Sequence, residues 1–158
     1  MIVRRLRKND GLEGLMRLSR EFFEEYAEHH GEFFRIGTLR DSDILDYFSS
    51  FIDREDRAAF IASSGGEDVG YITVLVQTQP AYWSIGRVGH ISGLMVARES
   101  RRTGVGGRLL EAALDFFAGK GLAHYTVSTA VANRQGLKFY AGHGLEPLQT
   151  VLLGRVQR

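Results

Sequence analysis

Residues 101–108 read Arg101-Arg102-Thr103-Gly104-Val105-Gly106-Gly107-Arg108. They join an apolar run to an amphipathic one. The run before them, residues 90–97, is mostly apolar and predicts a largely buried strand. After them, apolar side chains recur at helical spacing with charged side chains between them. These apolar residues are Val105, Leu109, Leu110, Ala113, Leu114 and Phe117. The sequence therefore predicts a strand that enters a helix through a glycine-rich loop.

A loop of this kind leaves main-chain N–H groups uncovered at the start of a helix. Glycine has no side chain to shield the backbone, and the first N–H groups of a helix lack an intrahelical partner. The positive end of the helix dipole adds to the attraction of an anion. The loop therefore predicts a site for a phosphate or pyrophosphate beside a sheet. The alternative is a glycine-softened turn that binds nothing.

Two common phosphate-binding motifs do not fit the spacing. A dinucleotide-binding fingerprint requires G-x-G-x-x-G, but Leu109 stands where the third glycine should be. A P-loop requires a lysine and a hydroxyl residue after its last glycine, and Arg108 follows the glycines here. The pattern that fits is R-x-x-G-x-G, at Arg101, Gly104 and Gly106.

This pattern resembles the pyrophosphate loop of the GNAT superfamily, the acyl-CoA-dependent N-acetyltransferases. The superfamily has a second signature: a strand, an asparagine that opens a short helix, an aromatic pair ending in tyrosine, and a Gly-Phe-like turn. The matching residues are Asn133, Phe139, Tyr140, Gly144 and Leu145. Leu145 replaces the usual phenylalanine and Gly136 the usual alanine. Two signatures at family-like separation arise by chance far less often than one.

The resemblance implies an α/β fold of mixed α+β type in three layers. A central mixed, mostly antiparallel sheet is splayed at a parallel strand pair and carries helices on both faces. Acetyl-CoA is the implied co-substrate, with its pantetheine arm in the splayed opening. Gly93 predicts a bulge there, or else a glycine tolerated for packing. The residues implied to bind the coenzyme are Leu94, Met95, Val96, Arg101, Arg102, Thr103, Gly104, Val105, Gly106, Gly107 and Asn133.

The resemblance assigns Tyr140 as the general acid. A thiol has a pKa of about 8.5 and a tyrosine one of about 10, so a phenol within reach can protonate a departing thiolate. Without its motif, such a tyrosine is usually a core residue. Asn133 would bind the pantetheine arm, cap a helix, or do both. The side chains of Arg101 and Arg102 either attract the pyrophosphate or form a solvated surface pair.

The general base is not fixed by the sequence. His90 begins the central strand and can reach a cleft, but a lone strand histidine is more often structural. Glu25, Glu28, His29 and His30 stand near the end of the first predicted helix, where the superfamily shapes its acceptor site. Their acidic run favours a cationic acceptor, or is a solvated helix face.

The acceptor is equally open. Superfamily members that acetylate protein N-termini often carry a glutamate where this chain has Ser128, so the resemblance does not support that activity. Tyr82 and Trp83 stand on a long loop, 78–86, and either line an acceptor pocket or cover the core. We therefore expect transfer of acetyl, or another short acyl group, to a primary amine of a small molecule or peptide by direct attack in a ternary complex.

Length and composition limit the other possibilities. The 158 residues predict a single domain, 1–158, and the resemblance implies that it is of the GNAT N-acetyltransferase type. The net charge of +1 argues against a nucleic-acid or membrane partner. The absence of cysteine excludes disulfides and thiolate metal sites, and no other metal motif is visible. With no signal-peptide core in residues 1–8, we expect a cytoplasmic protein. Homodimers are common in the superfamily, but the oligomeric state cannot be read from the sequence.

The other elements are predicted from caps, periodicity and turns. Strands are expected at 2–6, 57–63, 69–77 and 124–130, with a last apolar strand near 148–156. Two helices are expected to open at Asp10 with Glu13 and at Thr38 with Asp41. Their predicted buried faces are Leu12, Leu15, Met16, Phe22, Phe23 and Tyr26, and Ile44, Leu45, Phe48, Phe51 and Ile52.

Three functions compete at this point. The first is the N-acetyltransferase. The second is a non-catalytic acyl-CoA-binding module, which keeps the glycine loop but has no need of Tyr140. The third is a nucleotide-binding regulator, which ATP or NAD would stabilise better than CoA does.

Overall fold

A five-stranded sheet forms the centre of the first of two compact units. The computed structural model describes residues 1–157, and its contacts group them into Met1–Ser128 and a unit that begins at Thr129. The sheet order is β1-β2-β3-β4-β5, and among the described strands only β4 and β5 pair in parallel. The strands are β1 (Ile2–Arg5), β2 (Arg57–Ser64), β3 (Glu67–Thr78), β4 (Arg87–Val96) and β5 (Tyr125–Val127). The predicted mixed, mostly antiparallel sheet is confirmed.

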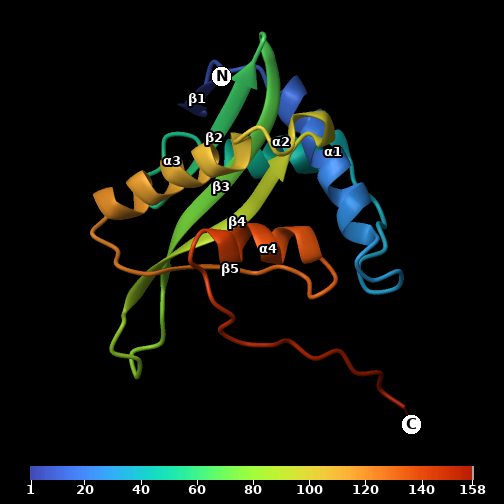
Figure 1. Cartoon of the computed structure of the whole chain (residues 1–158), viewed down its shortest axis with the longest axis vertical. Coiled ribbons are helices and arrows are strands. Elements are labelled where there is room, and N and C mark those ends of the chain that lie inside the picture. The colour runs from blue at the N-terminus through green and yellow to red at the C-terminus, as the bar shows by residue number, and fades with distance from the viewer. Residues whose placement is uncertain (158) are drawn as a thin grey trace. The chain divides into compact units, whose positions relative to one another are not determined.

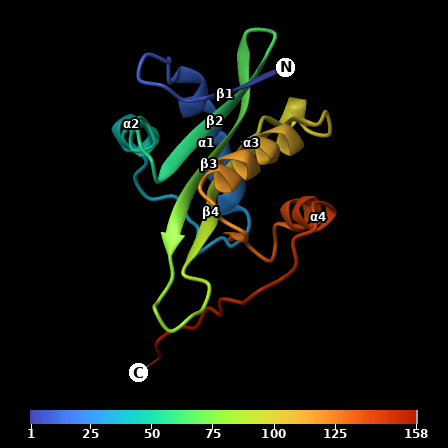
Figure 2. The same cartoon turned by 90° about the vertical axis from the view of Figure 1, so that its left-hand side faces the viewer.

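Helices cover both faces of this sheet. In the first unit, α1 and α2 lie on one face and α3 on the other (Figures 1 and 2). A short 3-10 turn, η1 (Arg98–Ser100), joins β4 to the loop before α3. The helices are α1 (Glu13–Ala27), α2 (Asp41–Ser49) and α3 (Val105–Gly119) in the first unit, and α4 (Arg134–Gly142) in the second. The predicted layers are therefore present, and the predicted element order is confirmed as far as α4.

The core under α1 and α2 is built jointly by the helices and the sheet. Leu15 and Leu18 of α1 and Phe48 of α2 are fully buried. They belong to one cluster: Leu6, Leu15, Leu18, Ile44, Phe48, Phe51, Ala59, Ile61, Tyr71, Met95 and Ala97. Burial raises the pKa of the Tyr71 phenol. Because Met95 lies in the last residues of β4 and Ala97 directly follows the strand, this core fixes α1 against the strand end that leads into the glycine loop.

The buried helix faces differ from the prediction in one residue each. In α3, Leu114 is exposed and Phe116 is buried in its stead. A helix on a sheet turns only a narrow stripe towards it, and Phe116 reaches the Phe60 ring of β2 at 6.5 Å between ring centroids. In α1, Phe23 is exposed and Leu18 takes the core position. The helical period was predicted correctly, and the other predicted positions of both faces are buried or partly buried.

Strand β4 contains the predicted bulge. Thr73 of β3 pairs with Gly93, whereas the next residue, Val74, pairs with Ile91. Ser92 is therefore the extra residue that opposes no partner. The parallel pairing of β4 with β5 covers only three residues and ends at Ile91. The two strands thus stop pairing at the position where the bulge begins, which confirms the splayed parallel pair.

The caps of α1 and α2 are not those predicted. The Asp10 carboxylate accepts a hydrogen bond from the Arg7 N–H at 2.7 Å, so it closes a turn before the helix, and α1 begins after Leu12 without a side-chain cap. Thr38 likewise does not cap α2, which begins after Arg40. The Asp43 carboxylate accepts from the Arg40 N–H at 2.9 Å instead. Both helices start within a residue or two of the predicted place.

The predicted last strand is wrong. Residues 145–157 contain no helix or strand, and their apolar side chains are largely exposed. These side chains are Leu148, Val151, Leu152, Leu153 and Val156. An apolar run becomes a strand only when a neighbour supplies a ladder of hydrogen bonds, and the described part of the second unit contains no other strand. Of the helices within residues 1–157, none is both long and apolar enough to pass through a lipid bilayer.

Candidate active site

The loop before α3 presents a row of unbonded main-chain donors. Within residues 1–157, no acceptor is recorded for the N–H groups of residues 102–107, and the first N–H to bond back is that of Arg108, to the Gly104 carbonyl at 3.1 Å. Arg102 and Gly104 adopt positive φ angles of 62° and 87°. The Thr103 hydroxyl donates to the Ser100 carbonyl at 2.6 Å and closes the turn. Successive amides in such a conformation, together with a helix N-terminus, form a concave anion site.

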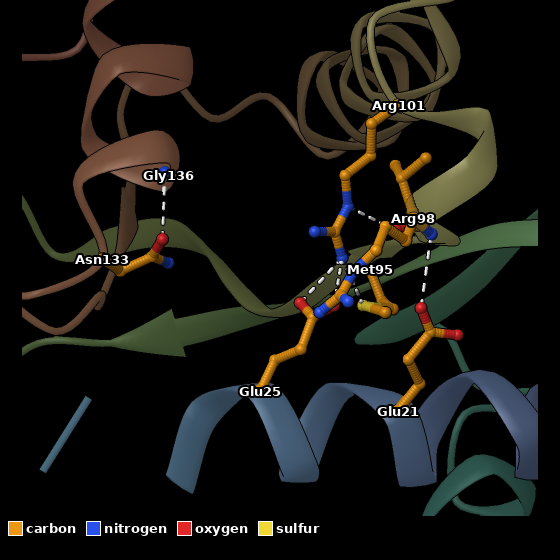
Figure 3. A network of polar contacts seen from close by, with 8 residues as sticks. Glu21, Glu25, Met95, Arg98, Arg101, Asn133 and Gly136 are labelled. Carbon is orange, nitrogen blue, oxygen red and sulfur yellow. Dashed lines mark hydrogen bonds and ion pairs between the residues drawn. The ribbon is translucent and has the colours of Figure 1, made fainter. Parts of the chain in front are cut away.

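The side chain of Arg101 is directed to α1 and β4 by its contacts. Its Nη2 contacts both carboxylate oxygens of Glu25, at 2.8 and 2.7 Å, and its Nε donates to the Val96 carbonyl at 3.0 Å (Figure 3). The neighbouring Arg98 donates its main-chain N–H to Glu21 at 3.2 Å. The sequence suggested Arg101 as a phosphate-binding residue and Glu25 as a residue of the acceptor site. It gave no signal that the two side chains meet.

The strand segment after the bulge has one open edge. Leu94, Met95 and Val96 pair with β3 on one side, opposite Ile72, Tyr71 and Gly70. On the β5 side, the recorded pairing ends at Ile91, before this segment begins. Main-chain groups on that edge have no strand partner among the described residues. The predicted coenzyme-binding residues of β4 therefore lie next to an interruption in the sheet.

A cluster of hydroxyl groups surrounds the bulge on the α2 side. The Tyr47 hydroxyl lies 2.9 Å from the Thr73 hydroxyl and 3.2 Å from that of Ser92. Ser92 also bonds to the Thr73 hydroxyl at 2.9 Å. A Cβ atom added to Gly93 would lie 3.2 Å from the Thr73 hydroxyl oxygen. The sequence analysis missed this cluster because its members come from three elements and only the strand register brings them together.

His90 lies on the same strand, before the bulge. Its Nδ1 is 2.9 Å from the hydroxyl of Thr126, its register partner on β5. The ring is half-buried, and this desolvation lowers the pKa of His90 below its ordinary value of 6.5. The imidazole is therefore neutral at neutral pH, which is the state in which it can accept a proton.

The second unit contains the other motif. The Asn133 Oδ1 accepts from the Gly136 N–H at 3.0 Å and caps α4 (Figure 3). Its Nδ2 donates to the Thr129 hydroxyl at 3.0 Å. Tyr140 is buried, and its ring meets that of Phe139 edge-on with centroids 5.2 Å apart. The helix ends in a turn in which the Leu145 N–H donates to the Tyr140 carbonyl. The capping role of Asn133 is confirmed.

We expect Asn133→Ala to lower the free energy of unfolding by about 1 kcal/mol, because the cap of α4 is lost. Urea unfolding followed by circular dichroism measures the change. Asn133→Asp is the matched control, since a carboxylate also accepts from the Gly136 N–H and should recover most of the loss. Equal destabilisation by both variants would show that the cap is not what Asn133 contributes to stability.

The sequence model of the acetyltransferase (GNAT) family matches residues 13–145. This range includes the glycine loop, the bulged strand and the capped helix. The chain belongs to the GNAT acetyltransferase family. The fold class and family expected from the two motifs are thereby confirmed.

Two curated relatives carry N-acetyltransferase names. YhfO of Bacillus subtilis (strain 168), an uncharacterised N-acetyltransferase, is 28% identical over 102 residues, which are 63% of this chain and 66% of that protein. An uncharacterised N-acetyltransferase of Archaeoglobus fulgidus is 26% identical over 128 residues, which are 79% of this chain and 84% of that protein. The chain thus spans just under two thirds of the first relative.

Several solved structures share the fold at low identity. A tetramutant of the BH1408 protein from Bacillus halodurans gives a TM-score of 0.84 at 19% identity and covers 99% of this chain and 100% of that one. AAC(6')-Iy in complex with the bisubstrate analogue CoA-S-monomethyl-acetylneamine gives 0.79 at 19%, covering 99% and 98%. The aminoglycoside acetyltransferase meta-AAC0020, from an uncultured soil metagenomic sample, in complex with sisomicin gives 0.72 at 23%, covering 99% and 96%.

Several residues that the sequence offered for the acceptor of this GNAT chain have structural partners. The His30 Nδ1 accepts from the Phe33 N–H at 3.0 Å, and the His29 ring lies edge-on to Tyr26 with centroids 5.1 Å apart. Tyr82 and Trp83 are both exposed, so they do not cover the core. Within residues 1–157, no group of three or more His, Cys, Asp or Glu side chains is arranged to hold a metal ion.

Proposed function

We propose that the chain is an acetyl-CoA-dependent N-acetyltransferase that acts on a primary amine and that residues 1–158 form its single catalytic domain. The observation that carries the proposal is the row of unbonded amides at residues 102–107, at the head of α3 and one short turn from the open edge of β4. A diphosphate needs several donors at once, and a thioester arm needs an unpaired strand edge to bind along. The chain has both features in consecutive segments.

In this proposal the coenzyme binds through main-chain groups. The amides of residues 102–107 donate to the pyrophosphate, and the positive end of the α3 dipole adds to the attraction. Leu94, Met95 and Val96 bind the pantetheine arm along their open edge, and Asn133 adds a side-chain contact. One amide of this strand polarises the thioester carbonyl, a contribution of about 3 kcal/mol when such donors are removed from other enzymes.

The transfer itself needs two proton movements. The neutral amine nitrogen attacks the thioester carbon, the C–S bond breaks, and Tyr140 protonates the departing sulfur. The phenolate then recovers a proton from solvent. The proton that the amine loses goes to a neutral base, either water or an imidazole such as His90, whose partial burial lowers its pKa and so favours the neutral form. Neither step requires a metal ion or a covalent acyl-enzyme.

Support for an amine acceptor comes from the structural neighbours, several of which are named as aminoglycoside acetyltransferases. At 19% to 23% identity these names do not identify the acceptor of this chain, so the proposal stops at a small-molecule or peptide amine. A cytoplasmic location and a homodimer are part of the proposal, and nucleic acid and membrane partners are not.

The proposal is tested by binding and turnover on the same preparation. Calorimetric titration with CoA and acetyl-CoA measures affinity, with ATP and NAD as comparison ligands. Release of free thiol from acetyl-CoA is then followed across a panel of polyamines, aminoglycosides and peptides. We expect CoA binding well above that of ATP or NAD, and thiol release that depends on one class of amine.

The competing functions predict other outcomes. Tight CoA binding without turnover on any amine would support the non-catalytic acyl-CoA-binding module. Stronger stabilisation by ATP or NAD than by CoA would point to a nucleotide-binding regulator and would refute the proposal.

A further inference from the structure

We propose that Glu25 of α1 is a positioning residue for the coenzyme, because its carboxylate clamps Arg101 and thereby fixes where the glycine loop begins. Arg101 then acts through this clamp and not by contacting phosphate. The inference rests on the proposed function, since it names how the same coenzyme site is held in place. It also reverses the role that the arginine motif suggests.

The contacts of the clamp are short and partly shielded from water. Arg101 Nη2 lies 2.7 and 2.8 Å from the two carboxylate oxygens of Glu25, across 76 residues of sequence. Their side chains are only 29% and 24% exposed. A charged pair on the open surface contributes little to stability, but a partly buried pair that also satisfies a backbone acceptor is less screened. The acceptor here is the Val96 carbonyl, 3.0 Å from the Arg101 Nε.

A second hydrogen bond attaches the same turn to α1. Glu21 stands one turn before Glu25 on α1, so both carboxylates lie on one face of the helix. Glu21 accepts from the Arg98 N–H at 3.2 Å, at the other end of the turn that Arg101 closes. Both ends of residues 98–101 are therefore tied to α1 (Figure 3). The helix is itself fixed by its buried leucines. The amides of residues 102–107 follow directly.

The conformation of the loop makes this anchor useful. Arg102, directly after the clamped residue, has a φ of 62°, which non-glycine residues seldom adopt. A residue in that conformation relaxes unless its surroundings hold it. By holding residue 101 to both α1 and the end of β4, the clamp keeps the turn in place and with it the amides of residues 102–107.

The clamp and the phosphate-contact interpretation predict opposite signs for one substitution. If Arg101 attracts the pyrophosphate by its charge, removing the Glu25 charge frees that arginine and CoA binds more tightly. If Arg101 acts through the clamp, Glu25→Gln loosens the loop and CoA binds more weakly. We expect a dissociation constant about ten-fold higher, equivalent to about 1.4 kcal/mol, with the KM for acetyl-CoA raised more than kcat is lowered.

The experiment uses the full chain and a matched control. Calorimetry with CoA compares wild type, Glu25→Gln, Arg101→Gln and the double variant. Glu24→Gln removes the same charge from the neighbouring, exposed position of α1 and should leave affinity unchanged. Because the two side chains act as a unit, the double variant should bind no more weakly than either single variant. Unchanged or tighter binding by Glu25→Gln would overturn the proposal.

A second measurement does not depend on the coenzyme. Amide hydrogen exchange of peptides covering residues 101–108 in the unliganded protein should be faster in Glu25→Gln than in wild type and unchanged in Glu24→Gln. If wild type binds no CoA, the proposed function fails, yet this exchange still decides whether the clamp orders the loop. Equal exchange in all three proteins would refute the clamp even if the enzyme is active.

Discussion

Replacing Tyr140 with phenylalanine is expected to lower kcat for acetyl transfer by about 10²- to 10⁴-fold, the range for loss of a positioned general acid. Phenylalanine keeps the ring that packs edge-on against Phe139 and removes only the hydroxyl. The fold of α4 and the affinity for acetyl-CoA should therefore change little. Thiol release at saturating acetyl-CoA gives kcat, and calorimetry gives the affinity.

Tyr125→Phe is the control for this prediction. Tyr125 also has a packed ring, stacked on Phe117 with centroids 5.7 Å apart, and the same atom is removed. It has no assigned part in the reaction, so its kcat should stay near that of wild type. A Tyr140→Phe enzyme that keeps its turnover would remove the acid assignment. Equal losses in both variants would attribute the effect to stability.

Substitution of Gly104 by valine should both destabilise the protein and weaken CoA binding at least ten-fold. Gly104 caps α3 with a φ of 87°, and a residue with a side chain pays about 1–2 kcal/mol in that region. A β-branched side chain is restricted further, so the loop would relax to another conformation. The amides on either side would then no longer converge, and each lost hydrogen bond to a charged group costs about 1.5–3 kcal/mol.

The other end of α3 provides the control. Gly121 follows the helix with a φ of 72°, and, as at Gly104, an added Cβ would meet no atom within 4 Å. Gly121→Val should therefore cause a similar loss in urea unfolding without a loss of CoA affinity. If Gly104→Val is destabilised equally but binds CoA as wild type does, the loop amides do not hold the pyrophosphate.

Local patterns predicted most of the fold. The strand, glycine loop and helix around residue 104 followed from adjacent residues, and Gly93 indicated the bulge because a glycine inside a strand often marks one. The Asn133 cap was also local, with its acceptor three residues from the donor. Features of this kind are encoded within one or two turns of chain, so a single sequence is enough to find them.

The errors arose where the partner of a residue in the folded chain could not be read from its local sequence. Asp10 has the right type and spacing for a helix cap, but it bonds to the Arg7 N–H. The run 148–156 has the apolar character of a strand, but a strand also needs a neighbour. The clamp of Glu25 on Arg101 joins residues 76 apart, and no local pattern marks such a pair. Sequence reasoning therefore identified the loop but not what holds it.

The extra residue in β4 has a consequence for how such a sheet can change over time. Gly89 and Gly93 are four residues apart and would share one side of a regular strand. Yet a side chain on Gly89 would meet Phe117 of α3, and one on Gly93 would meet Tyr71 and Tyr47 on the opposite side. Without Ser92, the side chains of β4 would alternate regularly between the two faces of the sheet. The remaining residues of the strand would keep the faces that they have now. One extra residue thus decides which face of the sheet the end of β4 presents to α1 and α2.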